Sequence, residues 1–179
     1  GACLVTDSGR AIVMTTAEHA RAVGREAVRV RGYGESHTHW TTAAMPDLAR
    51  HTAAEVSGRE AFAMAGIGHD AIDVVEIYDS FTITVLMTLE ALGFCKRGEG
   101  GAFVSGQRTA PGGAFALNTN GGGLSYAHPG MYGIFLLIEA VRQLRGECGE
   151  RQVKDAATAL VHGTGGMLSS GATCILSTR

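Results

Sequence analysis

The sequence predicts an α/β protein: an α/β/α layered arrangement around a five-stranded mixed sheet. Short apolar segments that fit strands alternate along the chain with longer segments of helical periodicity. Most are separated by connections long enough for a crossover, so most neighbouring strands are expected to be parallel. The last pair is expected to be antiparallel because its connection is short. The 179 residues are enough for one sizeable core.

Five segments have the composition of strands. In the first, residues 27–33, Val28 and Val30 alternate with Arg29 and Arg31, as in a strand with one wet face. The other four are residues 72–77, 114–118, 157–162 and 172–177. Two further apolar segments, residues 2–6 and 11–15, flank the sequence Asp-Ser-Gly and are expected to form a hairpin.

Three longer segments have helical periodicity. Residues 46–65 begin with a proline that suits a first turn, and residues 80–92 end before Gly93. Asp79 or Ser80 is the expected N-cap of the latter. The third is residues 130–144; residues 17–23 add one or two turns, and residues 96–113 have the composition of a glycine-rich loop.

Composition excludes several classes of function. A net charge of -2 and a pI near 6.4 argue against a nucleic-acid partner. The longest apolar run, residues 133–138, is too short to cross a bilayer, and the opening residues do not resemble a signal peptide. The four cysteines lack CxxC spacing, so neither a zinc site nor a disulfide framework is expected. We therefore expect a cytoplasmic protein.

Two histidines stand in glycine-rich loops that follow predicted strands. His128 lies in "NTNGGGLSYAHPG", and His162 begins "HGTGG". A neutral imidazole there can accept a proton or donate its N–H to a carbonyl oxygen. The neighbouring glycines leave room for a substrate to approach the backbone, so Gly122, Gly123, Gly165 and Gly166 are candidate substrate-binding residues. Helix capping and strand-end packing remain the alternatives for both histidines.

Two tyrosines accompany these histidines. Tyr78 follows a predicted strand at the same level as the histidines, and Tyr126 lies two residues before His128, on the same side of an extended chain. Simple packing is the alternative for both phenols. His37 and His39 have the spacing of a metal pair on a strand, but no third ligand is recognisable, so no metal is expected. Cys95 lacks an adjacent base and is interpreted as an inert thiol.

Three segments together resemble the C-terminal half of the thiolase superfamily. They are "DVVEIYDSFTITVLMTLEALGF", "NTNGGGLSYAHPGMYGIFLLIEAVRQL" and "ALVHGTGGMLSSGATCIL". The resemblance is closest to the lipid-transfer or sterol-carrier-protein type of thiolase. It implies a thiolase-like half-fold, with residues 17–179 forming the C-terminal domain and residues 1–16 supplying the closing strands of an N-terminal half.

The resemblance also implies roles for the candidate residues. His128 is similar to the family histidine that activates a nucleophilic cysteine and helps to form an oxyanion hole. His162 stands where ordinary thiolases have an acid/base cysteine, and Tyr78 where they have an asparagine that holds a water. Tyr126 is the fourth candidate catalytic residue, and all four are expected to line one pocket at the carboxyl ends of the strands. Nothing in the chain matches the nucleophilic cysteine of the family.

These roles imply an enzyme that makes or breaks a C–C bond next to an acyl-CoA thioester, of the Claisen or thiolytic acyltransferase type. The phenol of Tyr78 keeps a second activity open, retro-aldol cleavage of a 3-hydroxyacyl-CoA, as in thiolase-like aldolases of steroid side chains. A non-catalytic acyl-CoA or lipid-binding module is the third possibility. The resemblance implies a homodimer, with a small accessory OB-fold protein as a further partner. It implies no cofactor beyond coenzyme A, which is part of the substrate.

Overall fold

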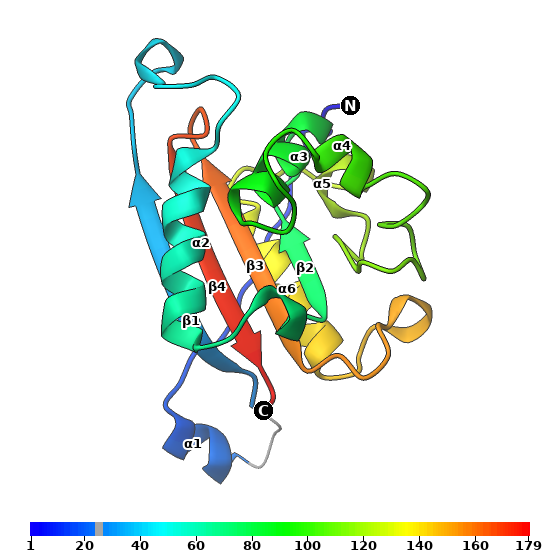
Figure 1. Ribbon diagram of the computed structural model, residues 1–179. Helices are drawn as coiled ribbons and strands as arrows, with labels where there is room; N and C mark the ends of the chain where they lie inside the picture. The colour runs from blue at the N-terminus through cyan, green and yellow to red at the C-terminus, as the bar shows by residue number, and fades with distance from the viewer. Residues whose placement is uncertain (24–26) are drawn as a thin grey trace.

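The computed structural model describes residues 1–23 and 27–179, and they form three layers (Figure 1). The central sheet has the strand order β1-β4-β3-β2. Its strands are β1 (Arg29–His37), β2 (Val74–Ile77), β3 (Thr158–Gly165) and β4 (Ser170–Ser177). Helices α2 (Thr52–Ala65) and α3 (Thr82–Ala91) cover one face, and α6 (Gly133–Leu144) covers the other. The predicted α/β/α layering is thus present.

The sheet is mixed, as predicted, but only one of its three pairs is parallel. β2 pairs with β3 in parallel, while β4 is antiparallel to both β3 and β1. The expectation that most neighbours are parallel was wrong because β4 lies between β1 and β3. Only residues 166–169 connect β3 to β4, so the chain must reverse there. β1, β2 and β3, which are joined through helices, do run in the same direction.

The prediction of five strands was also wrong, because the sheet has four. Residues 114–118 lie beside β2 but make only one isolated parallel bridge, between Val75 and Leu117. Asn118 has a positive φ of 46°, which turns the backbone away from β2. Its side chain then replaces the next rung of the ladder, since the amide accepts from Ile77 N at 2.7 Å and donates to Ile77 O at 2.9 Å.

The predicted hairpin near the start of the chain is absent. Ala2 bridges to Phe81 and Val5 bridges to His128, and residues 11–15 have no strand structure. The turn residues alone could not fix a hairpin, because both arms lack a sheet face to pack on. Val5 is 79% exposed, and Val13 is 94% exposed. That residues 1–16 belong to the sheet of another half therefore stays a prediction.

Helix boundaries differ from the predicted ones where local turns intervene. α2 begins at Thr52 rather than at residue 46, because Asp47 closes a turn by accepting from Ala49 N at 2.9 Å. The described chain also contains α1 (Ala17–Ala22), α4 (Gly100–Phe103) and α5 (Gly122–Ser125), and the short 3-10 helices Thr42–Ala44, His69–Ala71 and Gly149–Arg151. None of the described helices could span a membrane.

Candidate functional site

The structure brings Tyr78 and His128 together at the carboxyl end of β2. The Tyr78 hydroxyl lies 2.9 Å from Nδ1 of His128 and 3.5 Å from its Nε2. The two rings are nearly parallel, at 12°, with centroids 5.7 Å apart. Both side chains are half-buried, so a ligand can reach them. This pair is the centre of the candidate site.

Strand alternation places Tyr78 on the α6 face of the sheet. It comes directly after β2 and continues the face of Val74, which packs in the same apolar cluster. Its backbone N–H still follows the ladder and donates to the carbonyl of His162 at 2.9 Å. His128 lies five residues before α6 begins at Gly133, so the loop positions its ring and the helix does not.

Burial raises the pKa of Tyr78 above that of a free phenol, and the nearby Cys3 and Asp79 raise it further. The hydroxyl is therefore protonated at neutral pH. If it donates to Nδ1, Nε2 of His128 carries a proton that can be donated to a substrate oxygen. If Nδ1 carries the proton instead, the phenol can donate to the substrate and Nε2 can act as a base.

Tyr126 belongs to a separate set of hydrogen bonds beside this pair. Its hydroxyl accepts from the amide of Asn120 at 2.9 Å and from the hydroxyl of Tyr132 at 3.1 Å. The Tyr132 ring lies between the two groups, because its centroid is 5.7 Å from that of Tyr78 and 6.3 Å from that of Tyr126. Tyr126 is thus linked to the candidate site through Tyr132.

His162 lies on the opposite face of the sheet, and its side chain is fully buried. Its ring packs at right angles against His51, with centroids 5.4 Å apart and an interplanar angle of 83°. Within the described residues no side-chain hydrogen bond or ring contact joins His162 to Tyr78 or His128. The sequence placed the two histidines in one pocket, whereas the structure gives each its own partners.

Both buried histidines are held neutral. Burial lowers the pKa of His162 to about 3, with a smaller effect from His51, and burial lowers the pKa of His51 to about 4. Nδ1 of His51 faces Thr88, whose hydroxyl already donates to Thr84 O, so Nδ1 must be the donor. Nε2 of each ring is buried without a partner.

Two of the four glycines predicted to bind substrate have amides that donate to the protein itself, and the other two lie at a turn. Gly122 N donates to Asn120, and Gly123 N donates to Asp79 at 2.8 Å. Gly165 ends β3, and Gly166 starts the tight turn to β4 with a φ of 58°. These contacts give each glycine a structural reason to be there, and they leave the amides of Gly122 and Gly123 engaged.

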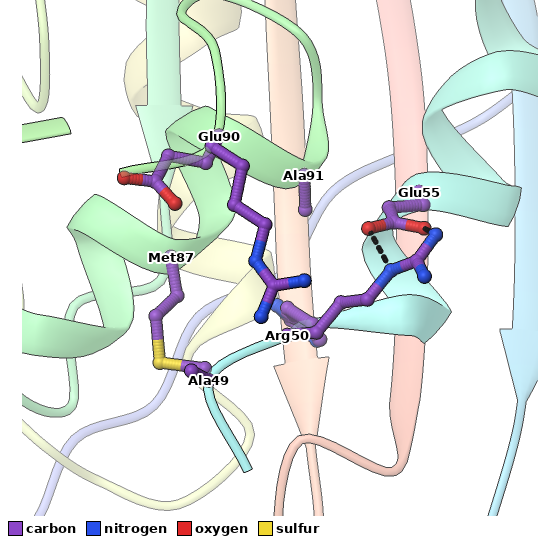
Figure 2. A pocket seen from close by; sticks show the side chains of 8 residues that line it. Ala49, Arg50, Glu55, Met87, Glu90 and Ala91 are labelled. Atoms are coloured by element: carbon purple, nitrogen blue, oxygen red, sulfur yellow. Dashed lines mark hydrogen bonds and ion pairs between the residues drawn. The ribbon is translucent and has the colours of Figure 1, made fainter. Parts of the chain in front are cut away.

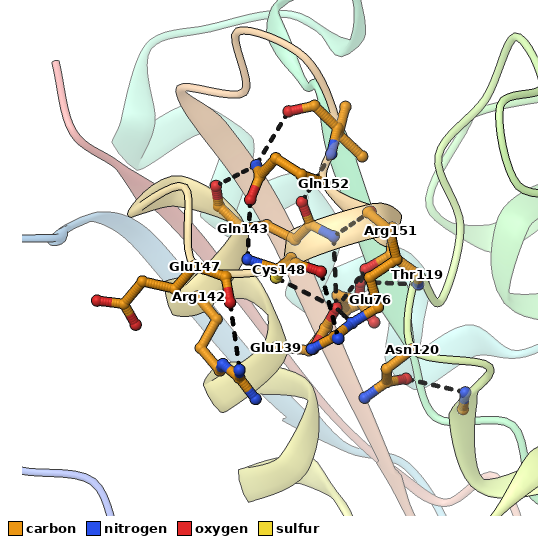
Figure 3. A network of polar contacts seen from close by, with 12 residues as sticks. Glu76, Thr119, Asn120, Glu139, Arg142, Gln143, Glu147, Cys148, Arg151 and Gln152 are labelled. Atoms are coloured by element: carbon orange, nitrogen blue, oxygen red, sulfur yellow. Dashed lines mark hydrogen bonds and ion pairs between the residues drawn. The ribbon is translucent and has the colours of Figure 1, made fainter.

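A buried polar network lies behind the site on the α6 face (Figure 3). Glu139 accepts two bonds from Arg151, at 2.9 and 3.1 Å, and a bond of 2.8 Å from the Thr119 hydroxyl. The same hydroxyl lies 2.9 Å from Glu76, whose pKa burial raises to about 8. A cavity of about 210 Å³ opens beside this network, bordered by Tyr126, Asn120 and three arginines (Arg10, Arg142 and Arg151).

The other cavity of note lies between α2 and α3 and holds about 30 Å³, the space of one or two waters (Figure 2). Arg50 and Glu55 pair across its edge at 2.6 Å.

In residues 1–23 and 27–179 no three His, Cys, Asp or Glu side chains are grouped to hold a metal. His37 bonds to Ser170 and His39 to Met167 O, so each ring has its own partner. Burial raises the pKa of Cys95.

Sequence reasoning missed Asp79, Tyr132 and His51 as parts of these arrangements. Asp79 is a predicted helix N-cap, but α3 is preceded by Phe81, and Asp79 binds the amides of α5 instead. The triple glycine at residues 121–123 was the available signal, because a carboxylate packed on it requires that no Cβ be there. Nothing local marked His51 as the partner of His162.

The three-layered fold and the paired Tyr78 and His128 at the strand ends define a thiolase-type α/β domain. A family profile described as "Thiolase C-terminal domain-like" matches residues 34–178, and the chain belongs to this family.

Among curated relatives, the chain is 33% identical to acetyl-CoA acetyltransferase of Methanothermobacter thermautotrophicus, over 97% of the chain and 45% of that protein. It is 41% identical to sterol carrier protein 2 of Rattus norvegicus over 61% of the chain and 20% of that protein. It is 36% identical to 17-hydroxy-3-oxo-4-pregnene-20-carboxyl-CoA lyase of Mycobacterium tuberculosis over 80% of the chain and 38% of that protein. The chain thus spans less than half of each relative.

A solved structure described as the Ltp2-ChsH2(DUF35) aldolase is similar, with a TM-score of 0.73 and 29% identity over 83% of this chain and 38% of that one. The relatives include acyltransferase, lyase and aldolase proteins, so the family is established and the reaction is open.

Proposed function

We propose that the chain is the C-terminal part of an enzyme that makes or breaks a C–C bond next to an acyl-CoA thioester. The observation that carries this proposal is the hydrogen bond of 2.9 Å between the Tyr78 hydroxyl and Nδ1 of His128. Both reactions pass through an enolate at the thioester, whose oxygen must receive hydrogen bonds. A half-buried imidazole with a protonated phenol beside it provides such a donor and a group that can move a proton.

In the acyl-transfer version, Nε2 of His128 donates to the enolate oxygen, and the nucleophilic cysteine comes from a part of the enzyme other than residues 1–179. The phenol then only orients the imidazole through Nδ1. The acetyl-CoA acetyltransferase relative supports this version.

Retro-aldol cleavage of a 3-hydroxyacyl-CoA is a second candidate, and the phenol of Tyr78 favours it. A base removes the 3-hydroxyl proton, the C2–C3 bond breaks, and its electron pair moves into the thioester as an enolate that is then protonated at C2. Nε2 of His128 can take the first proton while the Tyr78 hydroxyl donates to the thioester oxygen. The lyase and aldolase relatives support this version.

The proposal also covers the cofactor, the oligomeric state, the location and the partner of the enzyme. We expect acyl-CoA as the only cofactor-like component, a homodimer, and a location in the cytoplasm. An accessory protein, expected from the sequence to have an OB fold, gains support from the two-component name of the similar aldolase structure.

The test uses Tyr78→Phe in the complete enzyme, assayed separately for acyl transfer and for retro-aldol cleavage. Loss of cleavage with retention of ring stacking on His128 would assign the retro-aldol version. Unchanged cleavage would remove the phenol from the chemistry. Absence of both reactions in the unmodified enzyme would leave the binding module as the function, and acyl-CoA titration would measure it.

A further inference from the structure

Asp79 directly follows Tyr78 and is 2% exposed. One carboxylate oxygen accepts from Gly123 N at 2.8 Å, and the other accepts from Leu124 N at 3.1 Å. A buried carboxylate is costly unless such bonds satisfy it. The side chain therefore ties the end of β2 to α5, a segment more than forty residues further along the chain.

The glycines of α5 are matched to this carboxylate. A Cβ on Gly122 would lie 2.2 Å from Asp79 Oδ2, and a Cβ on Gly123 would lie 3.1 Å from Oδ1. Gly122 also has a φ of 67°, which L side chains rarely adopt. The close approach of the carboxylate to the backbone thus needs both the acid and the glycines.

The two ends of this connection carry the two members of the candidate site. Tyr78 precedes Asp79 by one residue, and His128 follows the clamped Leu124 by four. The backbone of His128 also contacts the exposed N-terminal segment, through the Val5 bridge and a 3.3 Å bond from Thr6 N to His128 O. Asp79 is therefore a buried connection between the segments that carry Tyr78 and His128.

We infer that Asp79 is a positioning residue that holds the His128 loop against Tyr78 and so fixes the contact between the phenol and Nδ1. This inference deepens the proposed function and rests on it for the predicted loss of turnover. Asp79 acts only through the loop and does not touch the reacting atoms. Its burial raises its own pKa, while the two amide bonds and the nearby His128 oppose that effect.

The chain contains a matched control at the opposite end of β2. Asp73 also accepts from two backbone amides, Ala157 N and Thr158 N, both at 2.9 Å. Both bonds fall on one oxygen, Oδ2, which an asparagine could replace, so Asp73→Ala is the control that removes a similar pair of bonds away from the site. Asp79→Asn is the test variant, because its amide can accept one of the two bonds and must face the other N–H with a donor of its own.

The experiment measures kcat and KM of both variants in the complete enzyme, together with the 15N chemical shifts of the His128 ring and the midpoint of unfolding. We expect Asp79→Asn to lower kcat by about a hundredfold with little change in KM, since a misplacement of about 1 Å costs that much. The His128 Nδ1 shift should change as well. Asp73→Ala should lose stability without either effect.

The inference is overturned if Asp79→Asn leaves kcat and the His128 shifts unchanged, or if Asp73→Ala changes them equally. If Asp79→Asn does not fold, Gly123→Ala replaces it, because the added Cβ displaces the same carboxylate while the charge stays. If the unmodified enzyme turns over no acyl-CoA, the proposed function fails, and the His128 shifts alone decide the role of Asp79.

Discussion

Two pairs of side chains, Tyr78 with His128 and His51 with His162, lie near the same end of the sheet but on opposite faces, and their surroundings give them opposite properties. On the α6 face His128 is half-buried, and its Nδ1 contacts the Tyr78 hydroxyl. On the α2 face His162 and His51 are fully buried, with Nε2 atoms that have no partner. A ligand can reach the first pair, whereas protonation of the second is opposed by burial. The comparison separates a half-buried candidate site from two rings buried in the core.

The largest expected effect is that of removing the imidazole of His128. His128→Ala should lower turnover of the complete enzyme at least about a hundredfold, since one oxyanion donor is worth roughly 3 kcal/mol. Its unfolding midpoint should change little, because the ring is half-buried. Steady-state kinetics and thermal unfolding measure both. A variant that keeps most of its activity would remove His128 from the mechanism.

The pattern of the sequence predicted the layers but not the faces on which the candidate residues meet. Loops after strands pointed to Tyr78, His128 and His162, and alternation along β2 and β3 then sends Tyr78 and His162 to opposite sides. Spacing cannot show the partner of a buried ring, which is why His51 was missed. Residues 114–118 do not form the fifth strand, because the left-handed backbone and amide side chain of Asn118 end their pairing with β2.

The resemblance to thiolases contributed what the physical pattern could not, because it singled out the Tyr78 and His128 loops from the other glycine-rich turns. It also placed His162 beside them, and side-chain contacts within the described residues do not bring it there. Roles carried over by position thus need the geometry of each side chain. The proton-transfer role of His162 stays a prediction.

The second prediction concerns the buried pair and acid stability. Because the folded pKa values of His51 and His162 are about 4 and about 3, the unfolded chain binds more protons below about pH 6.5. Stability should therefore fall as the pH drops from 6.5 toward 4, by up to about 1.4 kcal/mol per pH unit for each histidine.

His162→Gln should flatten this dependence, because it removes one of the two buried imidazoles. Urea unfolding at a series of pH values between 4 and 8 measures the slope. Equal slopes for the unmodified protein and the variant would mean that the buried pair does not control acid stability.

A third prediction concerns Glu76, a buried carboxyl group on the α6 face of the sheet. Burial raises its pKa to about 8, so the folded carboxyl is neutral at pH 7 while the unfolded one ionises above about pH 4.5. Stability should fall as the pH rises between these values. Glu76→Gln mimics the neutral form and should be more stable than the parent at pH 8, by about 1–3 kcal/mol.

Glu139→Gln is the matched control in the same network. Burial alone would raise the pKa of Glu139, but the bonds from Arg151 and Thr119 outweigh it and lower the pKa. Removing that charge leaves Arg151 without its partner, so this variant should be destabilised at pH 8. Opposite signs for the two variants, measured by urea unfolding, support the assignment of charge; equal signs contradict it.

The smallest expected effect tests the tautomer of His162. Nδ1 of His162 lies 2.9 Å from the Thr173 hydroxyl, which lies 2.9 Å from the Ser57 hydroxyl, and the latter donates to Ala54 O at 3.4 Å. This order lets Thr173 donate to Ser57 and accept from Nδ1–H. Ser57→Ala removes the acceptor of Thr173, so its hydroxyl turns to Nδ1 and the proton moves to Nε2.

The change should cost about 1–3 kcal/mol, because one hydrogen bond is lost and the new Nε2–H of His162 is buried without a partner. The 15N shifts of the two His162 ring nitrogens should exchange, because the protonated and bare nitrogens of a neutral imidazole have distinct shifts. His128 should keep its shifts, since it lies on the other face of the sheet from Ser57. If the shifts of the unmodified protein already show a protonated Nε2, Nδ1 was the acceptor from the start. Nε2 would then carry a proton in the unmodified protein, and a buried donor without a partner would destabilise the α2 face before any substitution.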